Sequence, residues 1–138
     1  MKWMLLVWEA LTEEHEDSSM VDNVVSLQTE ADLYRVITVS KDRPVFIYKH
    51  STACPICART YRLYHEYAGS KGEDAAPIFS EVFVIEKRVV SDAIENRFGI
   101  QHQSPQLLLI ADGQTVWNTS HFDITDDAMD KALEAIQQ

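Results

Sequence analysis

The chain has 138 residues, a formal net charge of −10 and 46% hydrophobic residues, with a pI of about 4.8. These values are typical of one globular domain with a sizeable core. The excess of Asp and Glu excludes the Lys- and Arg-rich surfaces with which proteins bind nucleic acid or anionic membranes.

The N-terminal segment is treated separately from the rest. Six apolar residues at 3–8 precede an acidic stretch at 9–17. A bilayer-spanning helix needs about 20 apolar residues, and six are also few for a signal peptide. We therefore expect a cytoplasmic protein with an N-terminal extension over residues 1–22 and one domain over residues 23–138. An added strand, an interaction patch or a translated leader before a start at Met20 would each account for the extension.

From Val24 onward, strand-like and helix-like segments alternate. Three helices have polar residues at their expected starts (Thr29, Ser91 and Thr125), two have glycines at their expected ends (Gly69 and Gly99), and Asp112-Gly113 predicts a hairpin. The pattern predicts strands at 24–27, 45–48, 81–85, 107–110 and 115–117, and helices at 29–37, 55–68, 91–98 and 125–136. This βαβαβαββα order predicts an α/β protein with a central mixed sheet flanked by helices, a thioredoxin-like fold.

The only two cysteines, Cys54 and Cys57, enclose Pro55 and Ile56. Proline is favoured at the first position of a helix, so Cys54 is expected at its N-cap, where free N–H groups and the helix dipole stabilise an anion. The pKa of Cys54 should therefore fall below the ordinary value of about 8.5. Cys54 is predicted to be the attacking thiolate, and Cys57 can attack the resulting mixed disulfide. Half of a metal site, or two buried apolar side chains, are the alternatives.

Lys49 and His50 precede this motif and would lower the pKa of Cys54 further if their charges face it. At the end of a strand, Lys49 could equally extend into solvent. Both interpretations are compatible with the sequence.

Ser104-Pro105 stands directly before the apolar strand at 107–110. A proline at the start of a strand removes no ladder hydrogen bond, so it needs no chemical role. Thioredoxin-fold proteins, however, have a cis-proline here, opposite the reactive cysteine. We predict a cis Ser104–Pro105 bond beside Cys54, which leaves the backbone of Ser104 available to a bound substrate.

The remaining chemistry-bearing side chains give weaker signals. Three tyrosines at a spacing of three are expected to pack the helix of the cysteine motif or to border a groove, and four histidines lack metal-site spacing and are expected to be structural or exposed. These are Tyr61, Tyr64 and Tyr67, and His15, His65, His102 and His121. No metal site is expected.

Taken together, several segments resemble the YtxJ-like monothiol bacilliredoxin family, and the resemblance runs from about Val24 to the C-terminus. They are Lys49-His50-Ser51-Thr52-Ala53-Cys54-Pro55-Ile56; Arg88 and Ser91 with Ala93-Ile94; His102-Gln103-Ser104-Pro105-Gln106; Trp117-Asn118; and Ser120-His121 with Asp123-Ile124-Thr125. The resemblance implies a thioredoxin fold and a thiol–disulfide oxidoreductase that removes bacillithiol from mixed disulfides on client proteins. Bacillithiol would be a thiol co-substrate, and no tightly bound cofactor is expected.

By this resemblance Cys54 would take up bacillithiol. We expect the substrate to contact residues of the two most specific motifs: Lys49, His50, Thr52, Pro55, Ser104 and Pro105. The family usually has serine where this chain has Cys57, so a dithiol cycle closer to that of glutaredoxins and thioredoxins is an alternative. The first twenty or so residues also lie outside the family pattern.

Two further hypotheses belong to other classes. A metal or iron–sulfur carrier could use Cys54 as a ligand, with a second copy or a small thiol completing the set. A thioredoxin-fold interaction module could use the acidic, apolar N-terminus. A general thioredoxin- or glutaredoxin-like reductase is the nearest alternative enzyme.

Overall fold

The computed structural model describes residues 20–21, 23–53, 55–71 and 77–136. Predictions for residues 1–19 and for Cys54 lie outside these ranges. The strands are β1 (Met20–Val21), β2 (Val24–Ser26), β3 (Val45–His50), β4 (Ile78–Phe83), β5 (Gln106–Ala111) and β6 (Gln114–Ser120). The helices are α2 (Glu30–Val39), α3 (Pro55–Lys71), α4 (Arg88–Phe98) and α5 (Asp126–Ile136), with the 3-10 turn η1 (His121–Asp123) before α5.

The described strands form one mixed sheet in the order β1-β2-β4-β3-β5-β6. Strands β2, β4 and β3 are parallel neighbours, while β5 is antiparallel to β3 and to β6. From β2 to α5 the chain therefore follows the predicted βαβαβαββα order. Met20 and Val21 fall within the expected extension over residues 1–22; in the structure they pair antiparallel with β2 and extend the sheet at its edge.

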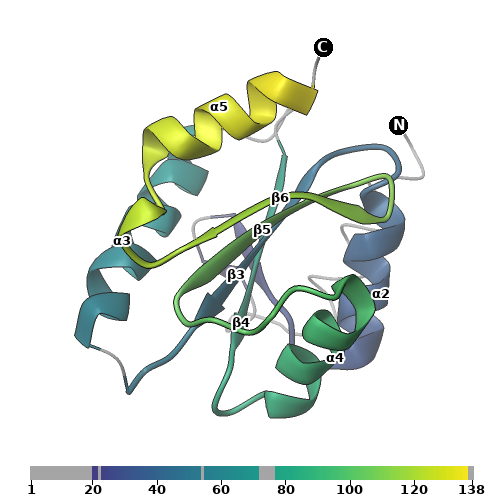
Figure 1. Cartoon of the computed structure of the whole chain (residues 1–138), viewed down its shortest axis with the longest axis horizontal. Coiled ribbons are helices and arrows are strands. Elements are labelled where there is room, and N and C mark those ends of the chain that lie inside the picture. Colours follow the sequence, from purple (N-terminus) through teal and green to yellow (C-terminus); the bar gives the residue numbers. More distant parts are fainter. Residues whose placement is uncertain (1–19, 22, 54, 72–76, 137–138) are drawn as a thin grey trace.

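Each face of the sheet is covered by its own pair of helices. In Figure 1, α2 and α4 lie on one side of the sheet, and α3 and α5 lie on the other. Alternate side chains of β3 follow this division. Val45 and Ile47 belong to the apolar cluster with α2 and α4, whereas Phe46 and Tyr48 belong to the cluster with α3 and α5. All six residues of β3 are buried, as expected for a central strand covered on both faces.

Several helix ends agree with their sequence signals. Thr29 and Asp32 form a reciprocal capping box at the start of α2, and Thr125 Oγ1 accepts from the N–H of Ala128 in α5. Gly99 ends α4 with a φ of 68°, a conformation that glycine adopts without a steric penalty.

Several predicted boundaries are wrong, and three of them concern elements around the reactive motif. Helix α3 continues through Gly69 to Lys71, so this glycine does not end the helix. Helix α4 begins at Arg88 rather than after Ser91, and Lys87 caps it without a side-chain hydrogen bond. The second parallel strand runs over 78–83, three residues earlier at its start than predicted, because Ile78, Phe79 and Ser80 also pair with β3.

Ser40, at the end of α2, is bonded to the turn between β5 and β6. The N–H of Asp112 donates to the Ser40 carbonyl at 2.7 Å, and the N–H of Gly113 donates to Ser40 Oγ at 2.9 Å. Asp112 and Gly113 both have positive φ values, 53° and 77°, which suit a tight two-residue hairpin. The predicted hairpin is confirmed, and these bonds fix it against α2.

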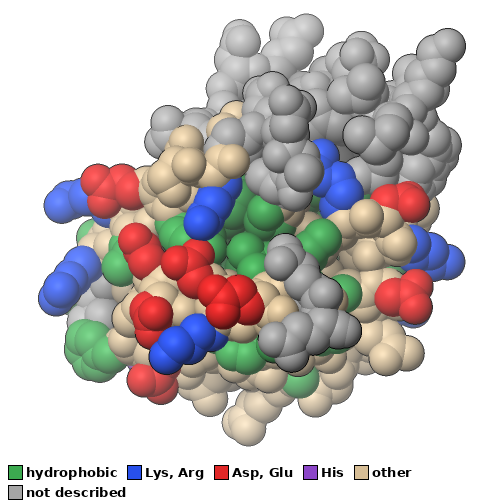
Figure 2. All heavy atoms as spheres, turned by 90° about the horizontal axis from the view of Figure 1, so that it is seen from above, with side chains coloured by type: hydrophobic (Ala, Val, Ile, Leu, Met, Phe, Trp, Pro, Cys, Tyr) green, Lys and Arg blue, Asp and Glu red, His purple; other side chains and the backbone are tan. Residues whose placement is uncertain are grey.

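The surface reflects the acidic composition. On the face in Figure 2, acidic side chains gather in a group next to hydrophobic side chains, and Lys and Arg side chains lie around this group. Within the described ranges, no helix has the length and the apolar character needed to cross a bilayer.

Candidate functional site

The cysteine motif lies where β3 ends and α3 begins. Helix α3 starts at Pro55, the residue that follows Cys54, as the sequence predicts. Cys57 lies in the first turn of α3 and its side chain is fully buried. The first N–H groups of a helix have no partner within the helix and favour a nearby negative charge.

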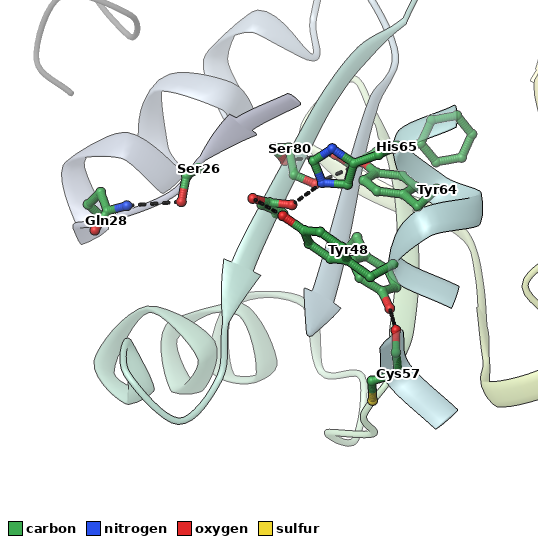
Figure 3. Close-up of polar contacts among 10 residues, drawn as sticks. Ser26, Gln28, Tyr48, Cys57, Tyr64, His65 and Ser80 are labelled. Atoms are coloured by element: carbon green, nitrogen blue, oxygen red, sulfur yellow. Dashed lines mark hydrogen bonds and ion pairs between the residues drawn. The ribbon is translucent and has the colours of Figure 1, made fainter. Parts of the chain in front are cut away.

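Aromatic side chains from β3 and α3 lie next to this first turn (Figure 3). The Tyr48 hydroxyl donates to the backbone carbonyl of Cys57 at 3.5 Å. The Tyr48 and Tyr64 rings stack with centroids 4.9 Å apart, and the Tyr64 hydroxyl donates to the Ser80 carbonyl at 2.8 Å. Burial raises the pKa of Tyr64 far above its ordinary value, so this side chain is a neutral donor. The packing interpretation of the tyrosines on α3 therefore agrees with the structure at Tyr64.

Lys49 is buried near the end of β3, on the face of the sheet covered by α4. Its ammonium lies 3.2 Å from Nδ1 of His102. Because an ammonium can only donate, Nδ1 accepts and the ring proton of His102 resides on Nε2. Burial lowers the pKa of Lys49 to about 8, against the opposing charges of Glu95 and Asp92. The interpretation in which Lys49 extends into solvent is wrong.

His50 points to the opposite face, towards α3. Its ring lies 4.5 Å from that of Tyr61 and 5.3 Å from that of Phe83, measured between centroids. Burial lowers the pKa of His50, which favours the neutral ring at neutral pH. His50 Nδ1 is buried without a hydrogen-bond partner among the described residues. Of the two residues before the cysteine motif, Lys49 is therefore the one that carries charge near pH 7.

The loop before β5 contains the predicted cis Ser104–Pro105 bond. Pro105 is buried, and Ser104 Oγ has no hydrogen-bond partner within the described part of the chain. Both polar atoms of the Gln106 side-chain amide form hydrogen bonds with the backbone of the preceding loop. Its Nε2 donates to the Gln101 carbonyl at 3.0 Å, and its Oε1 accepts from the N–H of Gln103 at 3.4 Å.

The segment before Cys54 is joined to the connection between β4 and α4. Thr52 Oγ1 donates to Glu86 Oε2 at 3.3 Å, and the N–H of Val84 donates to the His50 carbonyl at 2.9 Å. These bonds bring together the segment before the cysteines and the start of α4. The Lys49–His102 contact adds the loop that leads to Pro105, so the two sequence motifs meet at one end of the sheet.

Sequence reasoning missed one buried polar group beside this site. Glu81 and His65 form a pair with Oε1 and Nε2 2.7 Å apart, and both side chains are almost fully buried. The Tyr61 hydroxyl also donates to Glu81, at 3.4 Å. The expectation that His65 is structural agrees with this pairing. Its partner on β4 could not be read from the local sequence.

The comparisons with known proteins agree with this geometry. The model of the family described as monothiol bacilliredoxin BrxC matches residues 25–129, most of the chain. A solved structure with a thioredoxin fold is 28% identical, with a TM-score of 0.70 over 80% of this chain and 94% of that chain.

Two thioredoxin structures share the fold at lower identity. Poplar thioredoxin h is 18% identical, with a TM-score of 0.65 over 84% of this chain and 97% of its own. A thioredoxin variant from Halobacterium salinarum is 22% identical, with a TM-score of 0.62 over 86% of this chain and 95% of its own. The chain has the thioredoxin fold, belongs to the monothiol bacilliredoxin family, and is a thiol–disulfide oxidoreductase.

Proposed function

We propose that this protein reduces mixed disulfides between bacillithiol and cysteines of client proteins in the cytoplasm, with Cys54 as the nucleophile. The observation that carries the proposal is the start of α3 at Pro55, directly after Cys54, in a chain of the bacilliredoxin family. A thiolate beside a helix start is favoured by the unpaired N–H groups of the first turn. Bacillithiol is the co-substrate, and the reaction needs no tightly bound cofactor.

The first step is an exchange that conserves electrons. The Cys54 thiolate attacks the bacillithiol sulfur, the disulfide to the client breaks, and the client cysteine leaves as a thiolate. Cys54 then carries bacillithiol as a mixed disulfide. The client is reduced and Cys54 is oxidised by the same two electrons.

Two routes can regenerate Cys54. In the dithiol route, the Cys57 thiolate attacks the Cys54 sulfur, bacillithiol leaves as a thiolate, and an external dithiol then reduces the Cys54–Cys57 disulfide. In the monothiol route, a free low-molecular-weight thiol attacks the bound bacillithiol, which leaves as a small-molecule disulfide. Cys57 is three residues from Cys54, and its side chain is fully buried in the first turn of α3, which shields its thiol from thiols in bulk solvent.

A general thioredoxin-like reductase is the second candidate. It is favoured by Cys57 itself, a second thiol in a family described as monothiol. Such an enzyme would reduce an ordinary protein disulfide with a dithiol as electron donor and would need no bacillithiol.

The test compares wild type, Cys54→Ser and Cys57→Ser on a bacillithiolated model protein, with intact-mass detection of adducts. We expect Cys54→Ser to lose the activity. If Cys57 resolves, Cys57→Ser should accumulate a bacillithiol adduct on Cys54, which excess bacillithiol releases. Full activity of Cys57→Ser without a trapped adduct would establish the monothiol route.

An unchanged Cys54→Ser protein would contradict the assignment of the nucleophile. Reduction of insulin disulfides at a rate well above that of the bacillithiolated substrate would favour the general reductase instead.

A further inference from the structure

A small cavity of about 250 Å³ lies beside the cysteine motif, between the start of α4 and the loop before Pro105. It is lined by Val84, Ile85, Arg88, Ser91, Asp92, Glu95 and His102. Pockets that enclose a drug-sized ligand measure about 300–1,000 Å³. The cavity can therefore hold part of a small molecule rather than a segment of folded protein.

The cavity adjoins the reactive end of the sheet. Its wall at Val84 is bonded to the His50 carbonyl, and Glu86, two residues further, is bonded to Thr52. Its opposite wall is His102, three residues before Pro105. A molecule bound here would be held beside the segment that contains Cys54.

The walls carry charged groups of both signs. Arg88 and Asp92 lie one turn apart on α4, and neither has a hydrogen-bond or ion-pair partner among the described residues. Glu95 accepts the N–H of His102 at 3.0 Å, which holds that wall in place.

Lys49 is buried behind His102 and adds a positive charge next to this wall of the cavity. Its ammonium has three donors, fully buried, and its one hydrogen-bond partner among the described residues is Nδ1 of His102. This bond leaves the N–H of His102 on Nε2, so the imidazole can donate to a ligand. Burial, together with the charge of Lys49, lowers the pKa of His102 and keeps the ring neutral.

We propose that this cavity is a recognition site for the ionised body of a low-molecular-weight thiol, with Arg88 binding a carboxylate and Asp92 an ammonium or hydroxyl group. The inference rests on the proposed function, because it concerns the thiol exchanged at Cys54. Bacillithiol carries carboxylates, hydroxyl groups and an amine, so it suits both walls. A neutral thiol such as 2-mercaptoethanol offers nothing to Arg88.

Noncovalent binding is measured first, in the Cys54→Ser background, where no adduct can form on that residue. Calorimetric titration with bacillithiol, under reducing conditions, should give a Kd that rises about tenfold with Arg88→Gln or Asp92→Asn, the effect of one charge-assisted hydrogen bond. Arg97→Gln is the matched control, because Arg97 is an exposed arginine of α4 that does not line the cavity. It should leave the Kd unchanged within a factor of two.

Turnover is measured next, in proteins that retain Cys54. Arg88→Gln should raise KM for a bacillithiol mixed disulfide about tenfold and change kcat/KM for hydroxyethyl disulfide by less than a factor of two, since that substrate has no ionised group. Equal losses on both substrates, or no loss on either, would overturn the recognition site. Binding of bacillithiol no tighter than that of 2-mercaptoethanol would do the same.

The two proposals can fail separately. If wild type does not reduce the bacillithiol mixed disulfide, but the Cys54→Ser protein binds bacillithiol through Arg88, the proposed function is wrong and the recognition site stands. If reduction proceeds and Arg88→Gln affects neither Kd nor KM, the function stands and the site is refuted.

Discussion

Replacing Lys49 with methionine should stabilise the protein at neutral pH, although it removes a hydrogen bond. Lys49 is fully buried, and its ammonium bonds a neutral imidazole rather than a carboxylate. Methionine keeps a similar length and apolar stem without a charge. The cavity it leaves is therefore small, and the main change is loss of a buried cation.

The magnitude follows from the pKa of Lys49. A pKa lowered from 10.5 to about 8 corresponds to a penalty of about 3 kcal/mol for the charged form in the folded state, at about 1.4 kcal/mol per pH unit. Loss of the bond to His102 offsets about 1 kcal/mol of the gain. We therefore expect Lys49→Met to raise the free energy of unfolding by about 2 kcal/mol near pH 7.

The pH dependence of the free energy of unfolding gives an independent test of the sign of the Lys49 contribution. Below about pH 8, Lys49 is protonated in both the folded and the unfolded chain, and the whole penalty is present. Between about pH 8 and 10.5 the folded protein loses this proton first, so the unfolded chain binds more protons and stability rises with pH. Between about pH 7 and 9.5, wild type should recover about 2 kcal/mol relative to Lys49→Met.

Urea unfolding at about pH 7, 8 and 9.5, in the presence of a reductant, measures these differences. Lys41→Met, at an exposed position, is the control and should change stability by less than about 0.5 kcal/mol. A Lys49→Met protein less stable than wild type near pH 7, or a difference between the two that does not vary with pH, would refute the reasoning.

Three other substitutions test the packing and the backbone. His65→Leu removes the closer of two side-chain partners of the buried Glu81 carboxylate and leaves, among the described residues, only the Tyr61 hydroxyl at 3.4 Å, so it should cost about 3–5 kcal/mol in urea unfolding; a loss below about 1 kcal/mol would mean that the pair is not buried in solution. Gly99→Ala and Gly69→Ala each add a methyl group with nothing within 4 Å, but only Gly99 has a positive φ, of 68°. By thermal unfolding, Gly99→Ala should therefore cost about 1–2 kcal/mol, whereas Gly69→Ala within α3 should gain about 0.5–1 kcal/mol; effects of the same sign would contradict this assignment of backbone conformation.

The ends of helices and the position of the hairpin could be predicted where short sequence signals mark them. The capping box at Thr29, the left-handed Gly99 and the Asp112-Gly113 turn each act within four or five residues, so their effects can be read from neighbouring letters. The start of α4 has no such signal, because Lys87 makes no side-chain cap. The sequence therefore predicts the cap at Ser91, which in the structure lies within the first turn of α4.

The surroundings of the site depend on contacts between distant segments. Lys49 meets His102 across 53 residues, and Glu81 meets His65 across 16 residues and two elements of secondary structure. Both pairs depend on strand register and on which helix covers which face. Lys49 and His102 both lie in sequence motifs that resemble the family, and Lys49 is an expected site residue. Their contact, however, could not be predicted before the fold was known.

The bonds between Ser40 and the β5–β6 turn have a consequence for the order in which the chain assembles. They join residues 72 and 73 positions apart, and closing a segment of that length in the unfolded chain costs about 4 kcal/mol of conformational entropy, more than two hydrogen bonds return. We therefore expect this contact to form only after β3 and β5 have paired and brought its two ends together. In the folded chain it ties the last hairpin of the sheet to a helix that precedes the reactive motif.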